Sequence, residues 1–212
     1  MLKSYLYKDT LEVGLDEAGR GPLFGRVYVA AVILPPDNYF DHTLMGDSKK
    51  LTERKRLIAF DYIKENAIDW VIHYKEADYI DKHNIFAANY CAMHEALDKL
   101  LVKPEHILVD GNYFKPYMYS DGDYISHTTI VKGDQQYTSI AAASILAKVA
   151  RDNYILELCD KYPQLNEYYN MRSNKGYGAK KHIDGIKKYG ISKWHRKSFG
   201  ICKNAFVIDL TR

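Results

Sequence analysis

The stretch LEVGLDEAGRGPLFGRVYVAAVIL, residues 11–34, holds two strand-like segments on either side of a glycine-rich turn. Residues 11–17 alternate weakly between apolar and polar side chains and end on the acidic pair Asp16 and Glu17. Residues 26–34 are β-branched and almost wholly apolar, which is typical of a central strand buried on both faces. We therefore expect two strands joined by a short loop, with two carboxylates where the first strand ends.

The rest of the chain alternates between strand and helix patterns. We expect further strands over residues 69–76, 106–111 and 123–134 (the last with its outgoing loop), and helices over residues 52–67, 83–101 and 137–159. Tyr162 and Pro163 end the last long helix, and short helices follow near residues 179–189. This order predicts an α/β fold: a mixed five-stranded sheet with helices on both faces and a helical C-terminal extension, in one domain over residues 1–212.

Two of the expected helices carry apolar side chains at helical spacing. Thr52 suits the N-cap of the helix over residues 52–67, and Leu57, Ile58 and Tyr62 lie on one side of it. In the helix over residues 83–101, apolar side chains recur every three or four residues, which is typical of a buried face: Phe86, Tyr90, Met93, Leu97 and Leu100.

The composition is that of an ordinary globular protein, with 47% hydrophobic and 27% charged residues in a chain of 212. No run of 18 apolar residues is present, and the first ten residues lack the pattern of a signal peptide. We therefore expect a cytoplasmic protein. Cys91, Cys159 and Cys202 have no CxxC spacing, so we expect neither a zinc site nor a disulfide.

The net charge of +3 is unevenly distributed along the chain. Residues 161–212 contain twelve Lys and Arg side chains but only three acidic ones, and the residues before them are acidic on balance. A basic part on an acidic body indicates a polyanionic partner, although a solvated helical surface has the same charge pattern. His182 and His195 lie in this basic part, where they could contact phosphate or simply be exposed.

Four acidic residues, Asp16, Glu17, Asp110 and Asp134, each lie at the end of an expected strand or in the loop after it. The crevice outside the carboxyl ends of strands is the usual ligand site of α/β sheets. Carboxylates within about 4–6 Å repel one another unless a cation holds them ionised, and an all-oxygen set suits Mg²⁺ or Mn²⁺. The sequence thus indicates a metal site, while the preference of Asp for turns leaves a structural role open.

Adjacent residues of a regular strand point to opposite faces of the sheet, so Asp16 and Glu17 could not both ligate one metal from a regular strand. We therefore expect the strand to end or twist there, as Gly14 and Gly19 would permit.

The sequence Gly19-Arg20-Gly21, followed by Gly25, superficially resembles a dinucleotide-binding fingerprint. That motif must open a helix, whereas Pro22 and an expected strand follow here, so we disfavour a dinucleotide-dependent oxidoreductase. The turn either brings backbone groups close to a ligand, with Arg20 adding charge, or only connects two strands.

Together these residues make the chain resemble the type 2 ribonuclease H family, the bacterial ribonucleases HII. The matching segments run in order over nearly the whole chain: GLDEAGRGPLFGRV, GDSKKLTERKR, NIFAANYCAMHEAL, ILVDGNY, VKGDQQYTSIAAASILAKVARDNYI and KGYGAKKHIDGIKKYGISKWHRKSF. The resemblance implies a ribonuclease H-like fold and endonucleolytic cleavage of RNA in RNA–DNA hybrids, including a cut 5′ of single ribonucleotides embedded in duplex DNA. The intact Gly19-Arg20-Gly21 favours type 2 over the related type 3 enzymes.

The resemblance also implies a catalytic centre. Asp16, Glu17, Asp110 and Asp134 match the catalytic carboxylates and would hold Mn²⁺ or Mg²⁺, with Asp134 either serving the second metal or managing protons. The implied reaction is two-metal-ion phosphodiester hydrolysis that leaves a 3′-hydroxyl and a 5′-phosphate.

Substrate-binding residues are implied in the same way. Gly19, Arg20 and Gly21 match the turn that reads the ribose 2′-hydroxyl, Tyr177 matches the tyrosine that packs against the deoxyribose 3′ of the cut, and Lys49 would lie near a phosphate. Basic residues of the C-terminal part would hold the duplex.

We expect a monomer whose partners are RNA–DNA hybrid and ribonucleotide-containing duplex DNA, with no membrane contact and no small-molecule cofactor. Two rival functions remain: a resolvase-like nuclease that acts on DNA alone, and a nucleic-acid-binding protein that has lost catalysis. Cleavage of all-DNA duplexes would favour the first, and a lack of Mg²⁺-dependent turnover the second. For the tyrosine-rich residues 112–124 we expect only an edge or surface loop.

Overall fold

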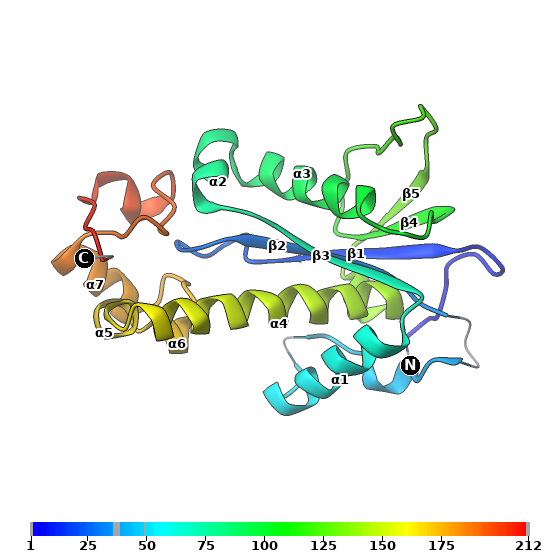
Figure 1. Cartoon of the computed structure of the whole chain (residues 1–212), viewed down its shortest axis with the longest axis horizontal. Coiled ribbons are helices and arrows are strands. Elements are labelled where there is room, and N and C mark those ends of the chain that lie inside the picture. Colours follow the sequence, from blue (N-terminus) through cyan, green and yellow to red (C-terminus); the bar gives the residue numbers. More distant parts are fainter. Residues whose placement is uncertain (1, 36–38, 49, 211–212) are drawn as a thin grey trace. The chain divides into compact units, whose positions relative to one another are not determined.

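The computed structural model describes residues 2–35, 39–48 and 50–210. It contains a five-stranded sheet with the strand order β3-β2-β1-β4-β5 (Figure 1). The strands are β1 Glu12–Ala18, β2 Val27–Ile33, β3 Asp69–Lys75, β4 His106–Asp110 and β5 Ser126–Ile130. β1 is antiparallel to β2 and parallel to β4, and β4 is parallel to β5. This confirms the predicted mixed five-stranded sheet.

Helices cover both faces of the sheet, with α3 on one side and α1 and α4 on the other (Figure 1). The helices are α1 Glu53–Asn66, α2 Ala77–His83, α3 Ile85–Asp98, α4 Thr138–Lys161, α5 Gln164–Tyr169, α6 Met171–Asn174 and α7 Lys180–Tyr189. Short 3₁₀ helices are η2 His42–Leu44, η3 Gly133–Gln135 and η4 Gly200–Asn204. α4 ends just before Tyr162 and Pro163, as predicted.

The helix α2 was not predicted from the sequence. It is short and is separated from α3 by Asn84. The backbone of Asn84 has a φ of 67°, outside the helical region. Its side-chain oxygen accepts hydrogen bonds from the N–H groups of Phe86 and Ala87, so that Asn84 caps α3. The helix expected from residue 83 therefore begins at Ile85.

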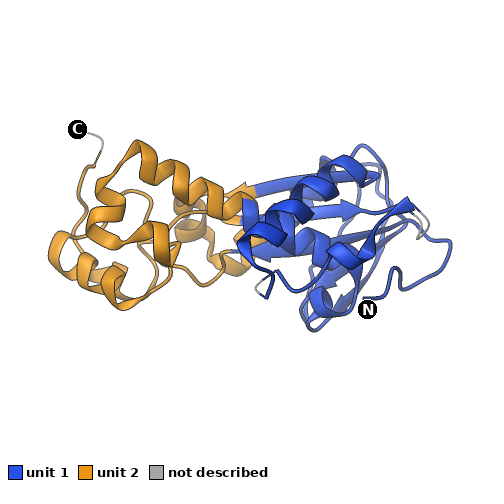
Figure 2. Cartoon of the chain, turned by 90° about the horizontal axis from the view of Figure 1, so that it is seen from below, with its two compact units in different colours: residues 1–18, 28–73, 90–149 blue, residues 19–27, 74–89, 150–212 orange. Residues whose placement is uncertain are grey.

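The described chain divides into two compact units (Figure 2). Unit 1 comprises residues 1–18, 28–73 and 90–149, and unit 2 comprises residues 19–27, 74–89 and 150–212. Unit 1 therefore contains most of the sheet, and unit 2 contains the glycine-rich turn together with the basic C-terminal part. The single domain over residues 1–212 stays a prediction.

The core of unit 1 lies on both faces of the sheet. On one face, Val13 and Leu15 of β1 pack with Ala92 and Met93 of α3. On the other face, Leu108 of β4 packs with Tyr137 and Ile140 at the start of α4. All seven residues of β2 are buried, which explains why its sequence is almost uninterruptedly apolar.

Backbone contacts backbone where β1 meets the first turn of α4. A Cβ atom on Gly14 would lie 2.2 Å from the carbonyl carbon of Ser139 and 2.5 Å from the backbone nitrogen of Ile140. Only glycine permits this approach. Gly14 therefore fixes the distance between the central strand and the longest helix.

The apolar side chains that the sequence placed together on α1 are not the ones that the helix buries. Thr52 caps α1 as expected, accepting a hydrogen bond from the N–H of Lys55. However, Leu57 and Ile58 are exposed, and α1 instead buries Ala59 and Ile63.

The apolar stripe of α3 is likewise buried only in part. Met93 and Leu97 lie in the core as predicted, but Phe86 at the start of the helix is 57% exposed. The guanidinium of Arg20 lies 5.3 Å from the Phe86 ring. Because periodicity cannot show how far a sheet extends beneath a helix, it overestimated the buried stripe at this end.

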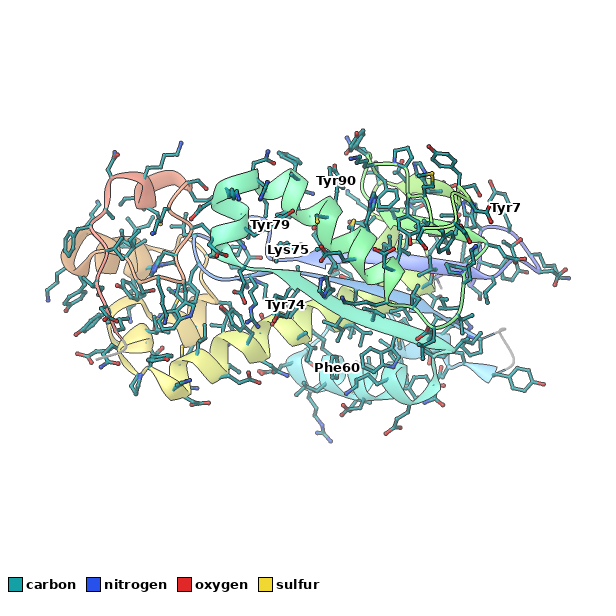
Figure 3. All side chains as sticks on the ribbon, turned by 45° about the horizontal axis from the view of Figure 1, so that its top comes forward. Tyr7, Phe60, Tyr74, Lys75, Tyr79 and Tyr90 are labelled. Carbon is teal, nitrogen blue, oxygen red and sulfur yellow. The ribbon has the colours of Figure 1, made fainter. Side chains whose placement is uncertain are left out.

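Within unit 2, a small apolar cluster joins Val27 to Ile80 and Ala88. Figure 3 shows Tyr74, Lys75 and Tyr79 at the corner where β3 leads into α2, and the Lys75 ammonium lies 4.4 Å from the Tyr79 ring.

His182 and His195 are buried side by side in unit 2, with 0% and 1% exposure. Both alternatives considered for them, phosphate contact and surface exposure, are therefore wrong. The Ser192 N–H donates to His195 Nδ1 at 3.0 Å, which leaves the proton of neutral His195 on Nε2. His195 Nε2 then donates to His182 Nε2 at 3.1 Å, and His182 Nδ1 donates to the Tyr177 carbonyl at 2.8 Å. Burial lowers the pKa of both imidazole rings and so favours their neutral forms.

The tyrosine-rich segment over residues 112–124 is a loop of unit 1, as expected, but part of it belongs to the core. Phe114 and Tyr117 are each 3% exposed, and the Tyr117 hydroxyl donates to Asp98 at 2.6 Å. Tyr113 and Tyr124 are exposed. The loop thus covers one end of α3.

Across the described residues, none of the helices combines the length and the apolar character needed to span a bilayer.

Replacing Gly14 by alanine should destabilise the protein by about 3 kcal/mol, because the added methyl group meets backbone atoms that cannot rotate away. Gly46→Ala is the matched control, since a Cβ atom there has no neighbour closer than 4.0 Å. The measurement is the free energy of unfolding in urea. Equal stability of the two variants would show that β1 and α4 are not held in this close contact.

Candidate active site

The parallel pairing of β1, β4 and β5 brings the four predicted catalytic carboxylates to the side of the sheet where the carboxyl ends of these strands lie. β1 pairs with β4 up to Leu15 and Val109, so the next residues along the two strands are Asp16 and Asp110. β5 ends at Ile130, opposite Asp110, and leads into the 3₁₀ turn that contains Asp134. We call Asp16, Glu17, Asp110 and Asp134 the acidic edge.

Asp16 is the most confined member of the acidic edge, with only 5% of its surface exposed. Burial raises its pKa well above the ordinary value for aspartate, and the charges of Glu17 and Asp110 raise it further. A hydrogen bond from Ser144 and one from the Glu17 N–H, at 2.6 Å, act in the opposite direction. An ionised Asp16 is therefore held at a cost that a nearby cation would offset.

A buried hydroxyl pair connects Asp16 to the loop before α1. The Ser144 hydroxyl, on α4, lies 2.9 Å from the Ser48 hydroxyl, and both side chains are buried. Arg56 of α1 fixes this loop by donating to the carbonyls of Ser48 at 2.7 Å and Leu51 at 2.9 Å. Neither serine could be identified from the sequence, because an isolated serine gives no pattern in a loop, as at Ser48, or in an Ala-rich helix, as at Ser144.

Gly133 connects Asp110 to Asp134, because it is hydrogen-bonded to the first and directly precedes the second in the chain. The Gly133 N–H donates to Asp110 Oδ1 at 2.7 Å. A Cβ atom on Gly133 would lie 2.6 Å from Ile140 Cδ1, so that a larger residue would disturb this turn. The next residue, Asp134, is 7% exposed.

The expectation that β1 ends at the acidic pair is wrong, and the alternative of a local twist stays a prediction. Both residues stay in the ladder, with Asp16 opposite Ala30 and Glu17 opposite Val29. The pleat of a regular strand directs neighbouring side chains to opposite faces. Among the residues that the structure describes, no three His, Cys, Asp or Glu side chains are placed so that they could already hold a metal ion. The donors are nevertheless all hard carboxylate oxygens, and their mutual repulsion fits a divalent cation.

The predicted sugar-reading residues come together within unit 2. A Cβ atom on Gly21 would lie 3.9 Å from the Tyr177 ring, and Tyr177 is 47% exposed. The chain bends at Gly19, whose φ is 96°, and at Gly25, whose φ is 79°. Lys49, the predicted phosphate contact, lies outside the described residues.

Two buried arginines donate hydrogen bonds to the carbonyls of this turn, and neither was identified from the sequence. Arg151 and Arg196 are 1% and 0% exposed. Arg196 was counted with the basic C-terminal part as a candidate for holding the duplex, because an arginine within a lysine-rich segment has no sequence mark of burial. Its neighbours Lys193 and Lys197 are exposed.

Sequence comparison identifies relatives over almost the whole chain. The model of the family described as Ribonuclease HII matches residues 13–202. A Ribonuclease HII of Phocaeicola vulgatus is 47% identical over 201 residues, which cover 95% of this chain and 94% of that protein.

Solved structures with the same fold include two kinds of ribonuclease H. The ribonuclease H2 of Pyrococcus horikoshii OT3 superposes with a TM-score of 0.74 at 26% identity, covering 91% of this chain and 95% of that one. A ribonuclease HIII, named Bst-RNase HIII and solved in complex with Mn²⁺, superposes with a TM-score of 0.57 at 21% identity, covering 85% of this chain and 63% of that one.

Without metal, Asp16→Asn should stabilise the protein at neutral pH by about 0.5–2 kcal/mol. The folded-state pKa of Asp16 lies above its unfolded value of about 3.9. Ionisation therefore penalises the folded state only above that value, and the penalty grows as the pH rises toward the folded-state pKa. The free energy of unfolding in EDTA, measured from pH 4 to pH 8, should show the gain appearing as the pH rises.

The control for this experiment is Asp61→Asn, on the exposed side of α1. An Asp16→Asn variant no more stable than the parent at pH 8 would contradict the repulsion assigned to the acidic edge.

Proposed function

The chain belongs to the ribonuclease HII family, and we propose that this endoribonuclease also cuts on the 5′ side of single ribonucleotides embedded in duplex DNA. The family match confirms the resemblance found in the sequence. Members of this family are hydrolases that cleave the RNA strand of RNA–DNA hybrids, and the same cleavage is the activity of this chain.

The intact Gly19-Arg20-Gly21 turn carries the finer proposal. Gly21 has no side chain, and the exposed Tyr177 ring lies beside it, so that backbone groups and one aromatic face are offered together. The 2′-hydroxyl is both a donor and an acceptor and distinguishes RNA from DNA. A backbone turn can recognise it without fixing a flexible side chain, which suits recognition of one isolated ribose.

The acidic edge is the proposed catalytic centre. Asp16, Glu17, Asp110 and Asp134 would hold Mg²⁺ or Mn²⁺, and the bound ions would stabilise the attacking and leaving oxygens of phosphodiester hydrolysis. The Mn²⁺ in Bst-RNase HIII, which has the same fold, supports the choice of a divalent ion. The products would be a 3′-hydroxyl and a 5′-phosphate.

The protein's own groups would prepare this centre. The Ser144 hydroxyl and the Glu17 N–H stabilise the ionised form of Asp16. The Gly133 N–H orients the Asp110 carboxylate. The two hydrogen bonds to Asp16 favour its ionised form, whereas burial raises its pKa and favours the protonated acid.

Exposed lysines of α7 would hold the duplex through its phosphates. Lys180, Lys181, Lys187 and Lys188 are all exposed, whereas His182 and Ile186 on the other face of the helix are buried. Phosphate contacts make binding steeply dependent on salt and nearly independent of base sequence.

The test is cleavage of a labelled DNA duplex that carries one ribonucleotide, with Mg²⁺ or Mn²⁺ and then with EDTA. We expect one metal-dependent cut 5′ of the ribonucleotide and no cut in the matching all-DNA duplex. Asp16→Asn should lose this activity while remaining folded, and Asp61→Asn should keep it.

Digestion of long RNA–DNA hybrids without a cut at the single ribonucleotide would refute the role of the turn. Cleavage of the all-DNA duplex would favour the resolvase-like alternative, and full activity of Asp16→Asn would refute the proposed catalytic centre.

A further inference from the structure

The guanidinium of Arg196 is enclosed by the turn over residues 19–26, which lies with it in unit 2. A guanidinium has five N–H donors, and here backbone carbonyls of this one turn accept all five. Nη2 donates to Gly19 at 2.6 Å and Arg26 at 3.1 Å, Nη1 to Arg20 at 3.0 Å and Pro22 at 2.9 Å, and Nε to Gly25 at 2.9 Å.

Arg151 adds a second buried cation to the same turn. Its Nη2 donates to the Phe24 carbonyl at 3.1 Å, and its Nε to the Arg26 carbonyl at 3.3 Å. Burial and the nearby charge of Arg151 lower the pKa of Arg196 to about 9, so that the guanidinium stays protonated at neutral pH. The inward-pointing carbonyl dipoles therefore compensate two cations that would otherwise repel each other.

This arrangement fixes the direction of the peptide groups on the other side of the turn. The C=O and N–H groups of a trans peptide point in opposite directions, and the described chain contains no cis peptide. Because the carbonyls of Gly19 and Arg20 point toward the guanidinium, the N–H groups of Arg20 and Gly21 point away from it. Those N–H groups belong to the Gly19-Arg20-Gly21 segment assigned above to the sugar.

We propose that Arg196 is a positioning residue for ribose recognition: its buried guanidinium holds the 19–26 turn in the conformation that recognises a 2′-hydroxyl. This inference rests on the proposed function, in which the turn reads the sugar. Arg196 contacts no substrate in this account and acts only through the backbone of the turn.

Lysine cannot replace Arg196 in this role. An ammonium has three donors that diverge from one nitrogen, whereas the five carbonyls surround a planar fork. Arg196→Lys keeps the positive charge but leaves at least two of the five carbonyls without their donor. The turn can then relax, while the exposed lysines that contact phosphates are unchanged.

The experiment uses the duplex with one ribonucleotide as substrate and the identical all-DNA duplex as a competitive inhibitor. For Arg196→Lys we expect kcat/KM on the substrate to fall at least tenfold, while the Ki of the all-DNA duplex stays within twofold of the parent value. A purely structural defect would lower kcat/KM and raise the Ki of the all-DNA duplex together. Circular dichroism and thermal unfolding establish that the variant is folded.

Tyr169→Phe is the matched control, because it removes a buried hydrogen bond of unit 2, from the Tyr169 hydroxyl to the Gly190 carbonyl at 3.0 Å, without touching the turn. It should keep the parent kcat/KM. A folded Arg196→Lys with the parent kcat/KM, or with a fall in kcat/KM matched by an equal rise in the Ki of the all-DNA duplex, would overturn the proposal.

Arg151→Lys tests the same idea if Arg196→Lys does not fold, since it disturbs the bonds to the Phe24 and Arg26 carbonyls. It should show the same selective loss, and parent-like kinetics would again overturn the proposal. A parent protein that does not cut the one-ribonucleotide duplex contradicts the proposed function itself, which separates the two failures.

Discussion

The contact between the backbone of Gly14 and the first turn of α4 is the constraint on which the acidic edge depends. From Gly14 to Asp16 a strand advances by about 6.6 Å, and from Ser139 to Ser144 a helix advances by about 7.5 Å. Two segments that touch at Gly14 and Ser139 therefore remain abreast at Asp16 and Ser144, where the hydroxyl reaches the carboxylate. The absence of a side chain at Gly14 thus allows the approach that brings the Ser144 hydroxyl to the buried Asp16 carboxylate.

The acidic edge and the 19–26 turn illustrate two ways of keeping charge inside a protein. At the acidic edge, burial and the neighbouring charges of Glu17 and Asp110 raise the pKa of Asp16, which suits the binding of cations. Around Arg196, every donor has a carbonyl partner, which suits a rigid support. A carboxylate whose ionised form is disfavoured by burial and like charges accompanies the proposed chemistry, and a guanidinium with five carbonyl partners accompanies the proposed positioning.

Much of this arrangement could be predicted from the sequence, because strand and helix periodicity and the ends of parallel strands are local signals. They gave the five strands and the gathering of Asp16 and Asp110 at one edge. Burial depends on neighbours that are distant in sequence, which is why Leu57, Ile58, Phe86, His182 and His195 were misjudged. Arg196 shows the limit most clearly, since five carbonyl acceptors some 170 residues away turn a surface-like arginine into a buried one.

We infer that the carboxylates of the acidic edge repel one another until a divalent cation binds them. The most direct test is the melting temperature with increasing Mn²⁺ for the parent, Asp16→Asn and Asp110→Asn. Binding to the folded state alone stabilises it by about 2.7 kcal/mol at a hundredfold excess over Kd. We expect the melting temperature of the parent to rise with Mn²⁺ and this rise to be lost in both variants. Equal rises in all three proteins, or no rise in the parent, would contradict it.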